Sequence, residues 1–134
     1  MRKIYWWRVL AVWAGLTLGI FNLVCWSAWA GEGLASYYTV ESCKREGTSG
    51  TYTANGELYK EADLTCALRR RDWGKMYLVC GPVGCAEVRH NDYGPGKGPT
   101  AKGVIIDLTP TGFKAVCGDL RQGKCEVGVM PVVE

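Results

Sequence analysis

Six cysteines between residues 43 and 125 are the feature that most limits how this chain can fold. They are Cys43, Cys66, Cys80, Cys85, Cys117 and Cys125. An even number of cysteines in a small exported domain is typical of a disulfide framework. The spacing lacks a Cys-x-x-Cys pair and His90 is the only histidine, so we expect no zinc or other metal site. The short separations favour Cys80–Cys85 and Cys117–Cys125, which leaves Cys43 to pair with Cys66, although the sequence leaves other pairings open.

The first 30 residues have the layout of a secretory signal. Basic residues stand at positions 2, 3 and 8, a run without charge covers residues 9–30, and the run ends in the small-x-small triplet Ala28-Trp29-Ala30. We therefore predict a signal peptide over residues 1–30, one domain over residues 31–134, and a secreted or periplasmic location. The apolar run exceeds the roughly 7–15 residues of an ordinary signal core, so an uncleaved membrane anchor is the alternative.

Charge excludes nucleic acid as the expected partner. The chain has 16 Lys and Arg against 13 Asp and Glu, and the three extra basic residues all lie in the first eight positions. Residues 31–134 are then formally neutral and lack the basic surface that phosphate binding needs. We interpret the run Arg69-Arg70-Arg71 as a solvated turn. The loop over residues 94–98 lacks the spacing of a phosphate-binding motif, and we expect no cofactor.

Short strand-forming segments separated by glycine-rich turns predict a mainly β domain. The expected strands are residues 34–39, 76–80, 85–90, 104–108 and 127–133. A short helix is expected at residues 111–116, because Thr109 is a good N-cap and Pro110 fits the first helical position. Polar glycine-rich residues 47–56 and 91–99 are expected to form loops.

Three carboxylates are candidates for chemistry. Strand alternation over residues 86–92 puts Asp92 on the apolar face, where a raised pKa suits a general acid. Asp107 has apolar neighbours and is either a catalytic acid or a structural group that accepts backbone N–H bonds. Glu57, which follows the turn pair Asn55-Gly56, is the third candidate for chemistry. The alternative is that Glu57 is a solvated loop carboxylate without a chemical role.

The order of five motifs resembles the RlpA-like domain over nearly all of residues 31–134. The motifs are Ala-Ser-Tyr-Tyr at 35–38, Thr-Ala-Asn-Gly-Glu-Leu-Tyr at 53–59, Leu-Thr-Cys-Ala at 64–67, Val-Arg-His-Asn-Asp-Tyr-Gly-Pro at 88–95 and Gly-Val-Ile-Ile-Asp-Leu-Thr at 103–109. The resemblance implies a six-stranded double-psi β-barrel with one or two short helices, shared with expansins and barwin-like proteins. Bacterial members of the family include lytic transglycosylases that act on peptidoglycan.

The resemblance gives the three carboxylates their expected roles. Glu57 and Asp92 match acidic positions associated with activity in the transglycosylases, and Asp107 matches the acid of expansin-like and endoglucanase relatives. The chain departs from the family at two positions, with Leu68 in place of a histidine and Tyr93 in place of an arginine.

Two functions follow from the resemblance. The first is a lytic transglycosylase that cleaves β-1,4 bonds of peptidoglycan and leaves 1,6-anhydro ends, with Glu57 and Asp92 as the acid and base. The second is a non-catalytic, expansin-like module that binds or loosens cell-wall glycan, which the loss of the histidine at Leu68 favours. In either case we expect Tyr38, Tyr59 and Tyr93 to contact sugar rings, peptidoglycan or another wall glycan to be the partner, and the protein to be a monomer.

Overall fold

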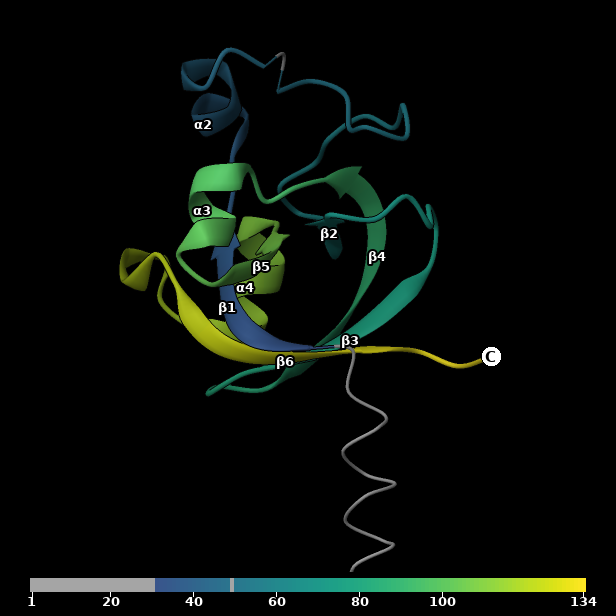
Figure 1. Cartoon of the computed structure of the whole chain (residues 1–134), viewed down its shortest axis with the longest axis vertical. Helices are drawn as coiled ribbons and strands as arrows, with labels where there is room; N and C mark the ends of the chain where they lie inside the picture. The colour runs from purple at the N-terminus through teal and green to yellow at the C-terminus, as the bar shows by residue number, and fades with distance from the viewer. Residues whose placement is uncertain (1–30, 49) are drawn as a thin grey trace, which may run out of the picture.

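The protein folds into a closed barrel of six strands. The structure, a computed structural model, describes residues 31–48 and 50–134, so the expected signal segment lies outside the described residues (Figure 1). The strands are β1 (Gly31–Tyr37), β2 (Thr65–Leu68), β3 (Met76–Cys80), β4 (Cys85–Tyr93), β5 (Val104–Leu108) and β6 (Cys125–Pro131). The predicted mainly β fold is confirmed.

The strands follow one another around the barrel in the order β1, β5, β2, β4, β3, β6. The neighbours β1 and β5 run parallel, as do β2 and β4, while the other neighbours are antiparallel. This mixed pairing in a closed six-stranded barrel is consistent with the double-psi arrangement. Among the six described strands, closure leaves no open sheet edge.

Alternating side chains fill the barrel interior. Val104, Ile106 and Leu108 of β5 are fully buried, whereas Ile105 and Asp107 between them are partly exposed. This is the two-residue period of a strand with one face in the core. Phe113 and Val116 of helix α4 (Pro110–Cys117) are also fully buried, so this helix closes part of the core.

The N-terminus of α4 confirms its prediction from sequence. Pro110 is the first residue of the helix, and the Thr109 hydroxyl accepts a bond from the Gly112 N–H at 3.2 Å. The same hydroxyl donates to the Asp63 carbonyl. The cap therefore fixes the strand-to-helix turn without any carboxylate from Asp107.

Other elements differ from the expectation. Helix α2 (Val40–Arg45) and strand β2 were not predicted, and helix α3 (Lys97–Ala101) lies in a segment expected to be irregular. Strand β4 also runs beyond His90 to Tyr93, because its parallel pairing with β2 continues that far. A 3-10 turn, η1 (Leu120–Gln122), precedes β6. None of the helices in the described residues is long and apolar enough to cross a bilayer.

The disulfides require one correction. Cys80–Cys85 and Cys117–Cys125 form as expected, but Cys43 and Cys66 are free. Cys66 is fully buried in the core, on a strand paired with β4 and β5. Cys43 is half-buried on α2, which stands beyond the end of the barrel (Figure 1). The third bond assigned by elimination was therefore wrong.

Candidate functional site

A polar, tyrosine-lined groove of about 290 Å³ lies between the barrel and the segment that follows β1. We call it the tyrosine groove. Its lining residues are Tyr38, Cys43, Glu46, Thr48, Gly50, Tyr52, Tyr59, Ala67, Asp92, Tyr93, Gly94, Gly96 and Asp107. Two of the three candidate carboxylates and all three candidate tyrosines belong to this set.

Asp92 is held in the groove by three hydrogen bonds. Its Oδ1 accepts the backbone N–H groups of Ala54 at 2.9 Å and Tyr93 at 2.8 Å, and its Oδ2 accepts the Tyr38 hydroxyl at 3.1 Å. Donors from three segments thus converge on one carboxylate and fix its orientation. Such a carboxylate is preorganised to accept hydrogen bonds from a bound hydroxyl.

A β-bulge aims Asp92 into the groove. Cys66 of β2 lies opposite His90, but the next residue, Ala67, lies opposite Asp92, so Asn91 is an extra residue in β4. The alternation predicted for this strand therefore stops at His90. Asn91 becomes almost fully buried, and Asp92 faces the groove instead of the core.

Asp107 projects into the groove from β5. Its Oδ1 accepts a hydrogen bond from the Ser36 hydroxyl of β1, and an added Cβ on Gly94 would stand 3.3 Å from its Oδ2. Burial raises the pKa of Asp107, the hydrogen bond from Ser36 partly opposes this, and the charges of Glu46 and Asp92 add smaller upward contributions. The raised pKa keeps a proton on this carboxyl to higher pH, which is the property a general acid needs.

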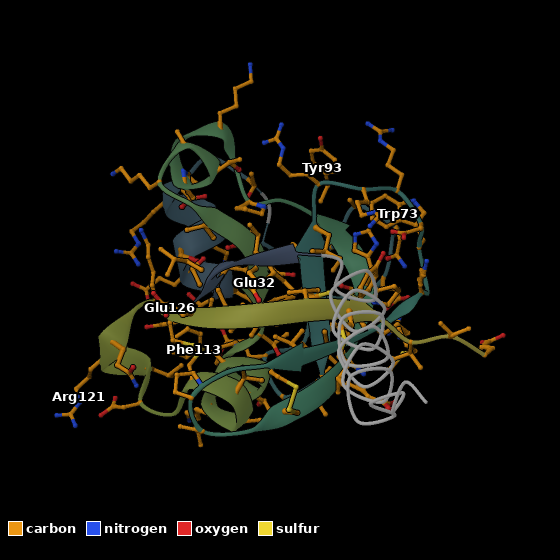
Figure 2. All side chains as sticks on the ribbon, turned by 60° about the horizontal axis from the view of Figure 1, so that its bottom comes forward. Glu32, Trp73, Tyr93, Phe113, Arg121 and Glu126 are labelled. Carbon is orange, nitrogen blue, oxygen red and sulfur yellow. A yellow bond between two sulfur atoms is a disulfide. The ribbon has the colours of Figure 1, made fainter. Side chains whose placement is uncertain are left out.

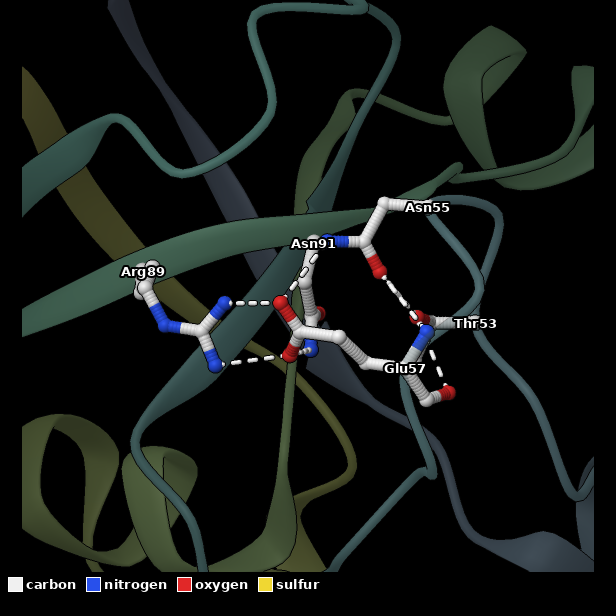
Figure 3. Close-up of polar contacts among 5 residues, drawn as sticks. All are labelled: Thr53, Asn55, Glu57, Arg89 and Asn91. Carbon is white, nitrogen blue, oxygen red and sulfur yellow. Dashed lines mark hydrogen bonds and ion pairs between the residues drawn. The ribbon is translucent and has the colours of Figure 1, made fainter.

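Glu57 does not line the tyrosine groove. Arg89 donates to both of its carboxylate oxygens, with Nη2 at 2.7 Å from Oε2, and the side-chain amides of Asn55 and Asn91 donate at 2.8 and 3.2 Å (Figure 3). The Arg89 contact, followed by the Asn55 bond, lowers the pKa of Glu57 to about 2. A carboxylate this strongly stabilised in its charged form is a poor proton donor or acceptor near neutral pH. The sequence places Glu57 with Asp92, whereas the structure brings Asp107 to Asp92.

The tyrosines of the groove differ in how far their rings are exposed. Tyr59 is only 7% exposed; its ring stacks on Tyr38 at 4.7 Å and its hydroxyl donates to the Tyr38 carbonyl. Burial raises the pKa of both hydroxyls, which therefore remain neutral hydrogen-bonding groups. Tyr93 is 47% exposed and Tyr52 is 66% exposed, so these two rings offer accessible faces. Tyr52 was missed from sequence, although an aromatic residue inside a polar loop was the available signal.

Leu68 stands where the RlpA-like domains that the motifs resemble carry a histidine, and this position does not open into the groove. Leu68 is 6% exposed and belongs to the hydrophobic core, while its neighbour Ala67 lines the groove. The chain's own histidine, His90, is fully buried, with Nδ1 at 2.7 Å from an oxygen of Asp72 and Nε2 at 2.9 Å from the Asp92 carbonyl. His90 thus supports the strand that carries Asp92 and does not reach the groove.

A larger cavity of about 690 Å³ lies over β1 and β6, on the outside of the barrel. Glu32 and Glu126 line it together with Cys80 and with glycine and aliphatic residues, and no aromatic side chain among the described residues lines it. It lacks the convergent hydrogen bonds that hold Asp92. Within residues 31–48 and 50–134, no group of three or more His, Cys, Asp or Glu side chains is placed to hold a metal ion.

The comparisons with known proteins show which fold this chain shares with solved structures, but they do not show a family for it. No protein-family model and no curated protein matches the chain. An apo expansin of Clavibacter michiganensis is similar with a TM-score of 0.57 and 20% identity over 77% of this chain and 50% of that one. An aspartate-to-asparagine mutant of that expansin, in complex with cellohexaose, is similar with a TM-score of 0.56 and 20% identity, over 76% of this chain and 50% of that one. The Streptomyces papain inhibitor is similar with a TM-score of 0.56 and 17% identity, over 78% of this chain and 97% of that one.

These likenesses support the barrel fold that the strand order already shows. The chain spans about half the length of the expansins it matches, and nearly the whole length of the papain inhibitor. At this level of identity the shared feature is the fold alone, and function must be argued from the groove.

Proposed function

We propose that this protein is an exported cell-wall protein that binds β-1,4-linked glycan in the tyrosine groove. The observation that carries the proposal is the combination of two inward carboxylates, Asp92 and Asp107, with two accessible aromatic rings, Tyr52 and Tyr93. Sugar rings present apolar faces that stack on aromatic side chains, and equatorial hydroxyls that donate to carboxylates.

Two further observations support export and a glycan ligand. The disulfides Cys80–Cys85 and Cys117–Cys125 are typical of proteins that fold in an oxidising compartment. One similar structure, the mutant expansin, is in complex with a glucan hexamer. Peptidoglycan is our first candidate among wall glycans, because the motifs in the sequence resemble those of RlpA-like domains.

Calorimetric titration with cellohexaose and chitohexaose tests the proposal. We expect Tyr52→Ala to weaken binding about 2- to 13-fold, since one stacked ring contributes about 0.5–1.5 kcal/mol. Val83→Ala is the matched control, because Val83 is 64% exposed in the turn between β3 and β4 and is not among the groove residues. If the parent protein binds neither these hexasaccharides nor peptidoglycan strands freed of stem peptides at millimolar concentration, or if Tyr52→Ala binds as well as the parent, the proposal is wrong.

Glycan cleavage is the second candidate function, and the presence of Asp107 together with Asp92 in the groove is the observation that favours it. Burial keeps this carboxyl protonated to higher pH beside Asp92, so Asp107 would protonate the leaving glycosidic oxygen. Asp92 would take the proton from the sugar's 6-hydroxyl as its oxygen attacks the anomeric carbon, which gives a 1,6-anhydro end without adding water. In this assignment Glu57 orders the loop next to Asp92 and does not take part in proton transfer.

Mass spectrometry of glycan strands freed of stem peptides separates cleavage from binding. A lytic transglycosylase produces fragments that lack one water relative to hydrolysis products. We expect Asp107→Asn to reduce their yield about 100-fold or more, the usual contribution of a positioned acid. If no anhydro fragments form between about pH 4 and about pH 8, the protein binds glycan without cleaving it.

A further inference from the structure

Two arginines flank the exposed ring of Tyr93 at the mouth of the tyrosine groove. The guanidinium carbons of Arg69 and Arg71 each lie 5.7 Å from the centre of the Tyr93 ring. The two cationic groups are therefore no further apart than twice this distance. Figure 2 shows Tyr93 at one edge of the molecule, with nitrogen-tipped side chains near it. We call this set, Arg69, Arg71 and Tyr93, the arginine rim.

The rim carries charge that the protein itself does not neutralise. Arg70, between the two, forms an ion pair with Asp72 at 3.7 Å. Within the described residues, no carboxylate lies within 4.0 Å of the nitrogens of Arg69 or Arg71. Two like charges beside one ring repel each other, and an anion placed between them would remove that repulsion.

Arg69 is tied to the wall of the groove. Its Nη1 donates to the Pro95 carbonyl at 3.1 Å, and the neighbouring residues Gly94 and Gly96 line the groove together with Tyr93. The groove thus has acidic groups inside, Asp92 and Asp107, and basic groups at its mouth. A neutral glycan needs only the interior and the aromatic rings, so the basic mouth points to a negatively charged substituent on the ligand.

We propose that the arginine rim selects glycans that carry carboxylates, and this inference rests on the proposed glycan-binding function. Guanidinium groups bind carboxylates through paired N–H donors, a geometry that matches the planar carboxylate. Inside the groove a carboxylate would meet Asp92 and Asp107 and be repelled. The neutral part of the sugar chain therefore occupies the groove, and its acidic substituent lies at the rim.

Titration calorimetry of the purified protein at about 50 and about 300 mM NaCl tests the selection. Three ligands are compared, namely chitohexaose, a strand of alternating amino sugars with a lactyl carboxylate on every second ring, and a β-1,4 glycan that contains glucuronate. The two acidic ligands distinguish a lactyl from a uronate carboxylate. Each acidic strand is also measured after its carboxylates have been converted to amides.

We expect at least one acidic strand to bind about 5- to 10-fold more tightly than chitohexaose at low salt. This preference should shrink at high salt and disappear after amidation. Arg69→Gln combined with Arg71→Gln should abolish the preference, measured as the ratio of the affinities for the acidic strand and for chitohexaose, so that a change in the groove wall that affects both ligands cancels. Arg71→Gln alone, which breaks no hydrogen bond to the groove wall, should remove part of it.

Arg121→Gln combined with Lys124→Gln is the matched control, because it removes the same charge from another part of the surface, where Arg121 pairs with Asp119 (Figure 2). This control should keep the preference. Equal binding of acidic and neutral strands by the parent, or a preference that survives in the rim double variant, overturns the inference while glycan binding stands. Absence of binding to every strand overturns the proposed function and the inference together.

Discussion

Replacing Glu57 by glutamine tests whether this residue holds the fold or takes part in chemistry. The pKa of Glu57 is lowered from 4.5 to about 2, chiefly by the hydrogen bonds from Arg89. Each pKa unit corresponds to about 1.4 kcal/mol, so a buried pair would stabilise the fold by about 3 kcal/mol. The side chains of Arg89 and Glu57 are 36% and 37% exposed, and solvent screening reduces the expected contribution to about 1 kcal/mol.

Urea unfolding and thermal melting measure this contribution. We expect Glu57→Gln to lower the free energy of unfolding by about 1 kcal/mol at pH 7 and the melting temperature by about 4 °C. Because the folded pKa is lowered, the stabilisation is fully present above pH 4.5 or so and is lost as the pH falls through about 2. The parent and variant should therefore differ at pH 7 and converge toward pH 2.

Glu87→Gln is the control, since Glu87 is an exposed acid on the same strand as Arg89. It should leave stability within about 0.5 kcal/mol. The reasoning is refuted if Glu57→Gln is as stable as the parent at pH 7. Unchanged stability together with loss of glycan cleavage would assign Glu57 to the chemistry instead.

Three further outcomes are expected. Thiol titration of the unreduced, denatured protein should label both Cys43 and Cys66. If neither thiol is labelled, the two cysteines form the third disulfide after all. Asp107→Asn should not destabilise the fold at pH 7, because a raised folded pKa makes the charged carboxylate unfavourable there; the parent should gain stability relative to this variant as the pH falls through that pKa. Leu68→His should cost about 2–4 kcal/mol in urea unfolding and add no cleavage, because this side chain lies in the core, whereas Ala67→His would direct an imidazole into the groove.

Local patterns were sufficient to predict part of the fold. Strands β3 and β5 begin and end where the sequence predicts, because one face of each is continuously buried. Helix α4 has both of its N-terminal signals, Thr109 and Pro110. Helix α2 was missed because none of its residues is buried and its capping box pairs Thr39 with Ser42, which is not the usual Glu or Gln.

The site depended on long-range contacts that no local pattern contains. Glu57 pairs with Arg89, 32 residues away, and this contact excludes it from the groove. The bulge at Asn91 changes which side of β4 Asp92 faces, and it arises from pairing with β2. Sequence reasoning therefore found Asp92 and Asp107 as candidates, but it paired Asp92 with Glu57, which is not among the residues that line the groove.

Mapping of chitohexaose and cellohexaose binding by amide chemical shifts tests the central claim that the tyrosine groove is the glycan site. The claim predicts saturable shifts at the amides of Ala54 and Tyr93, both of which donate to Asp92. Shifts centred instead on the larger cavity at Glu32 and Glu126, or no shifts at millimolar glycan, would contradict it.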